Sequence, residues 1–519
     1  MNVKDCILPV ATKVIGFMLV TLVIVSSVFP TTSWFTDSMT FPKWLCTWVS
    51  VLLLLAVCSL FKFFRISMPF LSVKDFSISV TIACALESLL FMAQRLLMVP
   101  KSGMAIAGSF DNVAGFASCL ALSIPWGING IRSHSPIIKW MIIVGKVVCV
   151  LGVLCSGSRV GILSLLAIGM VYLKVKRSWL LSALCVALLV LVIGFKHDSS
   201  SGRWFIYERS IEMIASKPLL GWGVRGFENN YMQAQADYFR QHGQSAYAML
   251  ADNVHHPLSE YLLVGVNFGV FAFLVPLGIT GLLLKRLSGD TSRQNLFATM
   301  VVLFLFCLFS YPLHYPFAWL MLAVVLLNMF ENKLCLPRMG YLAMLVVAIT
   351  LLFPAYFRYQ TERCWADLAE KAQYGLYKTT VPGYQKLMER KGNDPRFLYN
   401  YAAVLCEAGN LKLAKRVISG CYRSFKDYEV CLLAANIHAE KGDVRSAEKY
   451  YMEAHLMVPS RLMPLDGLFR LYRRSNQPAK AEQVGQDILR LKIKVPSSKA
   501  KEIREKVRFD LHHEGNSYD

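Results

Sequence analysis

The sequence predicts an all-α protein, in which a polytopic bundle of transmembrane helices precedes a domain of helical repeats. Three observations predict this fold class. The chain of 519 residues is 55% hydrophobic and contains about eleven apolar runs that are long enough to cross a bilayer. Basic residues gather in every second loop between these runs. After residue 357 the chain becomes rich in charge and alanine, and a spacing of about 34 residues recurs there.

The apolar runs are predicted to be membrane-spanning helices, each of about 20 residues. The first run has no cleavage site typical of a secretory signal, so we predict that it is the first span. The predicted spans are 13–30, 44–61, 76–94, 112–130, 138–156, 160–174, 179–196, 259–283, 296–312, 316–331 and 340–357.

Charge predicts the topology of the bundle. Each even-numbered span is followed by a basic loop, such as Lys62 and Arg65 after the second span. The positive-inside rule places these loops and the N-terminus in the cytoplasm. We therefore predict a membrane domain over 1–357, with its large loop 198–258 outside, and an extracytoplasmic domain over 358–519. The net charge of +21 lies largely in these loops, without interleaved aromatics, which argues against nucleic-acid binding.

The C-terminal domain contains a recurring set of small and apolar residues. Its members follow offsets of four and three residues, and successive sets lie 33 or 34 residues apart. This period is typical of tetratricopeptide repeats, which form α-solenoids and bind protein segments. An irregular helical bundle is the alternative. The four sets are Thr380, Tyr384 and Leu387; Ala414, Ile418 and Cys421; Ala447, Tyr451 and Ala454; and Ala481, Gly485 and Ile488.

The fourteen cysteines include no pair at CxxC spacing, so we expect most of them to be buried as small apolar residues. The redox state of Cys364, Cys406, Cys421 and Cys431 in the C-terminal domain stays open. The adjacent histidines of the loop have no acidic residue at a zinc-motif spacing. We therefore expect no metal and no cofactor.

The loop 198–258 holds the residues best suited to chemistry. Arginine suits phosphate and diphosphate, and histidine exchanges protons near neutral pH. Arg203 begins a helix that is predicted to run to about residue 215, where a cation gains nothing from the helix dipole. We therefore expect it to bind a phosphate or a carboxylate such as Glu260. Arg225 follows a glycine-dense stretch, and we expect it to be exposed, with substrate contact as the alternative.

The loop ends on His255 and His256, followed by Pro257, which disfavours helix before it. Glu260 lies one turn into the next apolar run. A carboxylate near a histidine orients its base form, so His256 and Glu260 are candidate catalytic residues. Two interfacial histidines without a role are the alternative. His314, in the turn before span 316–331, is a further candidate wall residue or a structural one.

Two more segments lie at the outer ends of spans. Gly108 to Asn112 precedes the fourth span, where Asn112 either caps the helix or forms a polar wall of the site. Arg159 opens the sixth span. It either extends to lipid headgroups or points into the bundle and binds a diphosphate.

Taken in order, these segments resemble the O-antigen ligase and polymerase superfamily of bacterial inner-membrane glycosyltransferases. The resemblance covers roughly 76–331. It rests on Gly-Ser-Phe-Asp-Asn at 108–112, on Arg-x-x-x-Leu at 159–163, on the stretch 203–227 and on Ser-Glu-Tyr-Leu with its later glycine at 259–269. The chain departs from the family pattern at Leu258, where relatives commonly have histidine, and at Ser259, where they have asparagine.

The resemblance implies an inverting, metal-independent transfer of an undecaprenyl diphosphate-linked glycan at the periplasmic face. The acceptor is lipid A-core or a protein Ser/Thr hydroxyl, and the repeat domain suggests a protein partner. A repeat-unit polymerase is an alternative of the same class. A transporter or a membrane-anchored scaffold is less suited, since Glu87 and Lys146 are the main ionisable residues within spans. The implied roles are catalytic for His256 and Glu260, and substrate-binding for Arg159, Arg203, His255, Asn112 and Arg225.

Overall fold

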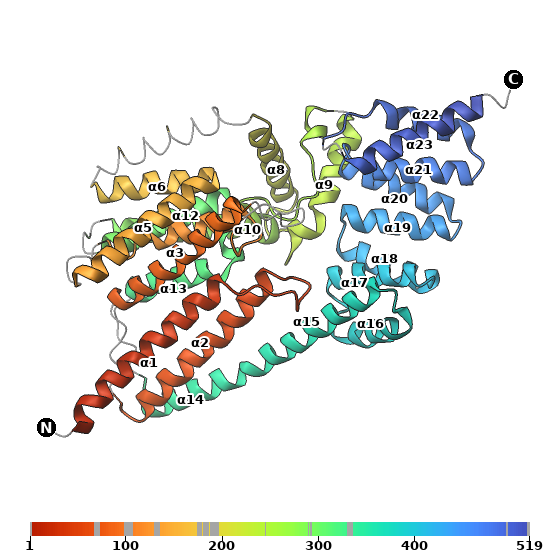
Figure 1. The fold of residues 1–519 in the computed structure, drawn as a ribbon. Helices are drawn as coiled ribbons and strands as arrows, with labels where there is room; N and C mark the ends of the chain where they lie inside the picture. Colours follow the sequence, from red (N-terminus) through yellow and green to blue (C-terminus); the bar gives the residue numbers. More distant parts are fainter. Residues whose placement is uncertain are drawn as a thin grey trace. The chain divides into compact units, whose positions relative to one another are not determined.

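The computed structural model shows a helical protein, with no strand in the part of the chain that it describes (Figure 1). Helices alternate with short turns throughout, as the sequence predicts. The structure describes residues 3–66, 73–97, 107–128, 135–173, 179, 186, 197–243, 245–288, 290, 293–329, 336–494 and 497–515.

Two compact units divide the chain. The first consists of residues 1–195, 258–261 and 275–366, and the second of residues 196–257, 262–274 and 367–519. The large polar loop therefore packs with the C-terminal helices, although we predicted it as part of the membrane domain. The chain passes from one unit to the other near residue 366, nine residues later in sequence than the predicted boundary at 357.

The first unit contains the apolar helices. Its helices are α1 (Val3–Val28), α2 (Thr40–Phe63), α3 (Val73–Leu96), α4 (Val113–Ser123), α5 (Pro136–Ser156), α6 (Arg159–Tyr172), the part of α11 (Val270–Leu287) that follows residue 274, α12 (Gln294–Phe309), η4 (Pro312–His314), α13 (Pro316–Met329), α14 (Arg338–Thr350) and the first part of α15 (Leu352–Gln373).

Helix α4 is the centre of this unit. It contacts α3, α5, α6, α12 and α13, and Gly115 to Ser123 are all buried. Its residues are small or apolar all round, which suits a helix enclosed by other helices. The turn that precedes α4 is thereby fixed against several elements of the bundle.

The helices support a multi-pass membrane protein. Among the described residues, six helices are long and apolar enough to cross a membrane, and four shorter apolar helices accompany them. These ten correspond to ten of the eleven predicted spans, whereas 179–196 falls almost wholly outside the described residues. The count of eleven stays a prediction.

The prediction of one continuous helix over 259–283 is wrong. The segment divides at Gly269 into α10 (Glu260–Phe268) and α11. Gly269 has φ of +90°, and a Cβ there would lie 2.5 Å from the carbonyl oxygens of Pro218 and Leu219. Only glycine fits this close backbone approach.

The second unit combines the polar loop with the C-terminal helices. The loop forms α8 (His197–Ser216), α9 (Gly226–His242) and the short η2 (Ala246–Met249). The C-terminal helices follow one another in chain order (Figure 1). They are α16 (Tyr377–Lys391), α17 (Pro395–Glu407), α18 (Leu411–Ser424), α19 (Tyr428–Glu440), α20 (Val444–Met457), α21 (Met463–Arg474), α22 (Pro478–Arg490) and α23 (Ser498–Gly515).

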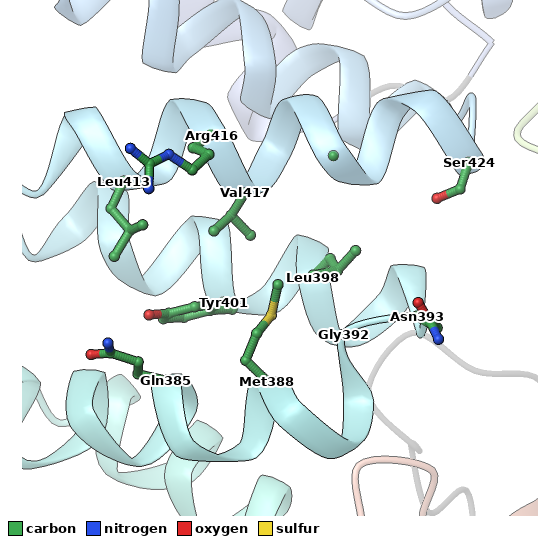
Figure 2. Close-up of a pocket in the computed structure, with 11 residues that line it drawn as sticks. Gln385, Met388, Gly392, Asn393, Leu398, Tyr401, Leu413, Arg416, Val417 and Ser424 are labelled. Carbon is green, nitrogen blue, oxygen red and sulfur yellow. The ribbon is translucent and has the colours of Figure 1, made fainter.

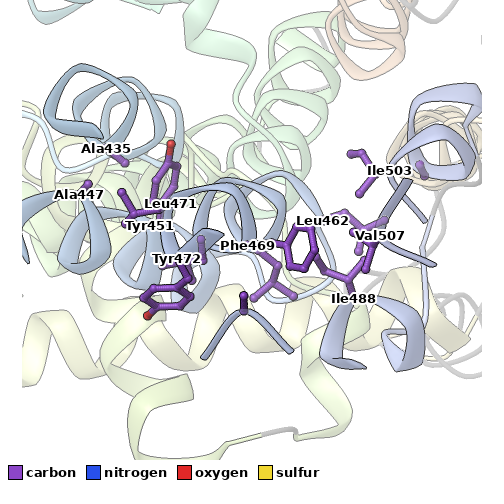
Figure 3. Close-up of a cluster of buried hydrophobic side chains, with 14 residues drawn as sticks. Ala435, Ala447, Tyr451, Leu462, Phe469, Leu471, Tyr472, Ile488, Ile503 and Val507 are labelled. Carbon is purple, nitrogen blue, oxygen red and sulfur yellow. The ribbon is translucent and has the colours of Figure 1, made fainter. Parts of the chain in front are cut away.

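The residues of the predicted repeats are buried. All twelve members of the four predicted sets lie in the protein interior. Figure 3 shows one core that contains members of the last two sets, where Ala447, Tyr451 and Ile488 pack with Phe469. A residue with positive φ lies in the turn after each of α15, α17, α19 and α21, at Gly375, Gly409, Gly442 and Asn476. The assignment of these helices to tetratricopeptide repeats stays a prediction.

The polar loop has its own packed core. Phe205 of α8, Phe239 of α9 and Ala248 of η2 are buried together, with Leu456 of α20 packed against them. Since α9 also contacts α20, the loop packs against the C-terminal helices within the second unit.

Candidate functional site

A polar cluster in the first unit surrounds the turn from Tyr311 to Tyr315. Asn112 caps α4, because its Oδ1 accepts a hydrogen bond of 2.7 Å from the Gly115 amide. Its Nδ2 donates to the hydroxyl of Tyr311 at 2.9 Å and also to that of Tyr315. Capping, one of the two roles expected for Asn112, is therefore confirmed. Its contact with a substrate stays a prediction.

Tyr315 is the central residue of this cluster, and it was not predicted. It is buried, its ring meets Phe110 edge-on at 5.1 Å, and its hydroxyl donates to Asp111. A Cβ at position 115 would lie 2.3 Å from the Tyr315 ring, so α4 needs glycine there. The sequence singled out this segment for His314, whereas its tyrosines make the polar contacts.

Glu260 lies against the same turn. Its carboxylate is buried, and Oε1 accepts a hydrogen bond of 2.9 Å from the Leu313 amide. The carbonyl oxygen of His314 accepts a hydrogen bond of 2.9 Å from the Trp44 indole. The structure thus brings Asn112, Glu260 and His314 to one turn, although these residues lie far apart in the sequence.

The segment before Asn112 is held by two buried charged residues. The amide of Ser109 donates a hydrogen bond of 2.6 Å to Oε1 of Glu87. The carbonyl oxygen of Ser109 accepts a hydrogen bond of 2.7 Å from Nζ of Lys43. Lys146, the other ionisable residue predicted within a span, donates to the carbonyl oxygen of Ser123. These contacts satisfy backbone groups at helix ends, so they support a structural role for these residues.

Arg159 is the first residue of α6, and its side chain is half-buried. Ser158 caps the helix by accepting a hydrogen bond of 3.2 Å from the Gly161 amide. Gly157, with φ of +68°, makes the turn that separates α5 from α6. The Gly157 turn and the Ser158 cap therefore fix the backbone at the start of α6, where Arg159 lies.

Two arginines of α8 differ in their surroundings. Arg203 is half-buried and hydrogen-bonds to Tyr207, one turn further on. Burial raises the pKa of Tyr207, and the Arg203 charge opposes that rise. Arg209 is buried, pairs with Glu208 at 3.0 Å and lies over the ring of Tyr238 at 4.4 Å. Arg209 therefore attaches α8 to α9. The prediction that Arg203 begins its helix is wrong, because α8 starts at His197, six residues earlier.

Arg225 is engaged in an ion pair. Its Nε and Nη2 donate to the Glu228 carboxylate at 2.8 and 3.0 Å, and Arg396 donates to the same carboxylate at 3.1 Å. Burial alone would raise the pKa of Glu228, but the two arginines outweigh it and hold the pKa below its usual value. Glu228 of α9 is therefore shared by Arg225 at the start of the same helix and by Arg396 of α17.

The two histidines follow η2 in the second unit. His256 is half-buried, while 45% of the His255 side chain is exposed. The ring of His255 stacks on Phe425, and its Nε2 lies 3.9 Å from Oδ2 of Asp427. The predicted pairing of His256 with Glu260 stays a prediction. The contact between His255 and the carboxylate of Asp427 was not predicted.

Leu258 has an unusual backbone. Its φ is +55°, which is rare for a residue other than glycine and costs free energy. No pattern in the sequence signals this conformation. Its place directly after the His255-His256-Pro257 segment means that the chain turns sharply between the histidines and α10.

Comparison with known families identifies the matched part of the chain. The model of the family described as O-antigen ligase matches residues 144–277. No curated protein matches the chain. The family match indicates a role in glycosyl transfer during the assembly of O-antigen or a related polysaccharide. The matched segment contains Arg159, Arg203, Arg225, His255, His256 and Glu260, whereas Asn112 precedes it.

Proposed function

We propose that the chain transfers a glycan from an undecaprenyl diphosphate-linked donor to an acceptor hydroxyl at the periplasmic face of the bacterial inner membrane. The acceptor is lipid A-core or a Ser/Thr hydroxyl of a protein. The observation that carries this proposal is the family match over 144–277, because it encloses both arginines and both histidines of the predicted site. The N-terminus is cytoplasmic and the repeat domain periplasmic in this proposal, as the basic loops indicate.

Arg159 and Arg203 bind the donor diphosphate in this proposal. Guanidinium groups bind phosphoryl oxygens in a forked geometry and stabilise the charge of a diphosphate leaving group without a metal ion. Both side chains are half-buried, and Arg159 is the first residue of α6, where the helix dipole favours an anion.

His256 orients or deprotonates the acceptor hydroxyl, and Glu260 supports it. Direct attack by this hydroxyl on the sugar inverts the anomeric configuration. His255 contacts the donor. Asn112 and Arg225 complete the substrate-binding set, and their own hydrogen bonds fix the backbone that carries them.

The repeat domain binds a protein partner in this proposal, as tetratricopeptide repeats do. A pocket of about 450 Å³ lies among α16, α17 and α18, and Figure 2 shows Leu398, Tyr401 and Val417 at its centre. Arg416 lines the same pocket, and it makes no ion pair within the described part of the chain. An apolar side chain next to a carboxylate fits these walls.

Deleting the gene and restoring it on a plasmid tests the proposed function. We expect the deletion to remove glycan from lipid A-core or from a periplasmic glycoprotein, while the lipid-linked glycan accumulates. Loss of long chains alone, with single repeat units still attached, favours the repeat-unit polymerase instead. An envelope with all these products unchanged contradicts glycosyl transfer and favours a scaffold or transporter.

A further inference from the structure

A carboxylate from the repeat helices lies buried beside one histidine of the loop. Asp427 precedes α19, and 4% of its side chain is exposed. Its Oδ1 caps the helix by accepting a hydrogen bond of 2.9 Å from the Glu429 amide. Its Oδ2 is buried and accepts no hydrogen bond from any residue that the structure describes. A buried, unsatisfied carboxylate oxygen is costly, so this atom points to a partner.

His255 is placed to be that partner. Its Nε2 lies 3.9 Å from Oδ2 of Asp427, and its ring stacks on Phe425 with 6.1 Å between the ring centres. This separation is too long for a hydrogen bond but suits an ion pair. Such contacts are often long before a substrate binds and shorten in the complex. The His255 side chain is 45% exposed, so a ligand can reach the ring.

The backbone on both sides of this pair is held in place. The amide of Lys426 donates a hydrogen bond of 3.0 Å to the carbonyl oxygen of Asn229 in α9. Arg461 binds Asp252, three residues before His255, at 2.8 Å. A hydrogen bond to α9 therefore holds the turn that carries Asp427. An ion pair with Arg461 holds the segment that carries His255.

We propose that Asp427 is a positioning residue that holds the ring of His255 toward the lipid-linked donor. The Asp427 carboxylate accepts the Nε2–H of the ring, which fixes the orientation of the ring and leaves Nδ1 for a polar group of the donor. This inference rests on the proposed function, since the glycan donor is the ligand that the proposed function brings to the loop.

Asp427→Asn tests the inference, because asparagine keeps the helix cap and removes the charge. We expect the KM for the lipid-linked donor to rise about tenfold, which corresponds to one charge-assisted hydrogen bond, with kcat nearly unchanged. Asp427→Glu should restore part of the donor affinity. The matched control is Asp394→Asn, because Asp394 caps α17 in the same way one repeat earlier.

A second measurement does not depend on activity. The ring of His255 is followed at one fixed pH by NMR of the isotope-labelled histidines in the full-length protein, with His255→Gln to assign its signal. The ring signal should move in Asp427→Asn and stay unchanged in Asp394→Asn. An unchanged ring signal in Asp427→Asn overturns the inference.

The outcomes separate this inference from the proposed function. If wild-type protein transfers glycan and Asp427→Asn keeps the wild-type KM, the positioning role is wrong and the glycosyltransferase stands. If the ring signal of His255 depends on Asp427 but wild-type protein transfers no glycan to any acceptor, the pair exists and the donor assignment is wrong.

Discussion

Gln235 of α9 donates a hydrogen bond of 2.5 Å to the carbonyl oxygen of Met457, the last residue of α20. The same amide nitrogen donates to the carbonyl oxygen of Asp252 at 3.1 Å. Gln235 is fully buried. One side chain therefore joins the loop helix, the segment that leads to the histidines and the repeat helices, so these parts should unfold together.

Gln235→Leu should weaken this junction. The change leaves two buried carbonyl oxygens without their donor, which costs about 1–3 kcal/mol. We expect faster amide hydrogen exchange over residues 246–257 of the full-length protein in detergent. Gln241→Leu, at an exposed position of the same helix, is the control. Equal exchange in both variants contradicts a role of Gln235 in docking the loop.

The Glu228 ion pairs predict a pH dependence of stability. Because the folded chain lowers the Glu228 pKa, its ion pairs contribute stability above the unfolded carboxyl pKa of about 4.3. That stability is lost as the pH falls through the pKa of Glu228 in the folded chain. We expect Glu228→Gln to lower the Tm at pH 7, and the difference from wild type to vanish in acid. Glu440→Gln, which removes an exposed pair with Arg474, should change little at either pH.

A difference in Tm between Glu228→Gln and wild type that is the same at pH 7 and in acid contradicts this assignment. It means that the carboxylate charge is not what stabilises the junction.

Gly115→Ala should disturb the polar cluster of the first unit. The added methyl group overlaps the Tyr315 ring, so the ring or α4 must move, at a cost of about 1–3 kcal/mol. We expect a lower Tm and reduced glycan transfer, because Asn112 and Glu260 share the Tyr315 turn. Gly169→Ala adds a methyl group in α6 with no atom within 4 Å and should be neutral or slightly stabilising. Wild-type behaviour of Gly115→Ala contradicts the rigid packing of this turn.

The pocket among α16, α17 and α18 predicts a preference in peptide binding. A fluorescent peptide with leucine beside aspartate should bind the full-length protein more tightly than its asparagine counterpart, because Arg416 has no competing ion pair in the described chain. Arg416→Glu should remove this difference, whereas Arg474→Ala should keep it. Equal binding of both peptides to wild type contradicts the partner site.

The sequence predicted those features that depend on local pattern. The period of the C-terminal domain identified twelve residues that are all buried, and the residues before α4 and α6 were correctly expected at helix starts. These predictions succeed because helix burial and capping depend on neighbours a few positions apart.

Relationships between distant parts of the chain could not be predicted from local pattern. Asp427 and His255 lie on different elements, and no local spacing connects them. The break at Gly269 depends on the carbonyl oxygens of residues 218 and 219, about fifty positions earlier. Tyr315 resembles any other aromatic residue at a membrane edge until its contacts with Asp111 and Asn112 are known.

Glycan transfer by purified protein tests the central claim most directly. The protein is reconstituted in liposomes with an undecaprenyl diphosphate-linked glycan and an acceptor, and the rate of product formation is measured for Arg159→Ala, Arg203→Ala and the surface control Arg474→Ala. We predict that the first two variants lose at least about a hundredfold in rate while staying folded, and that the control matches wild type. Wild-type rates for both Arg159→Ala and Arg203→Ala would contradict diphosphate binding by these arginines.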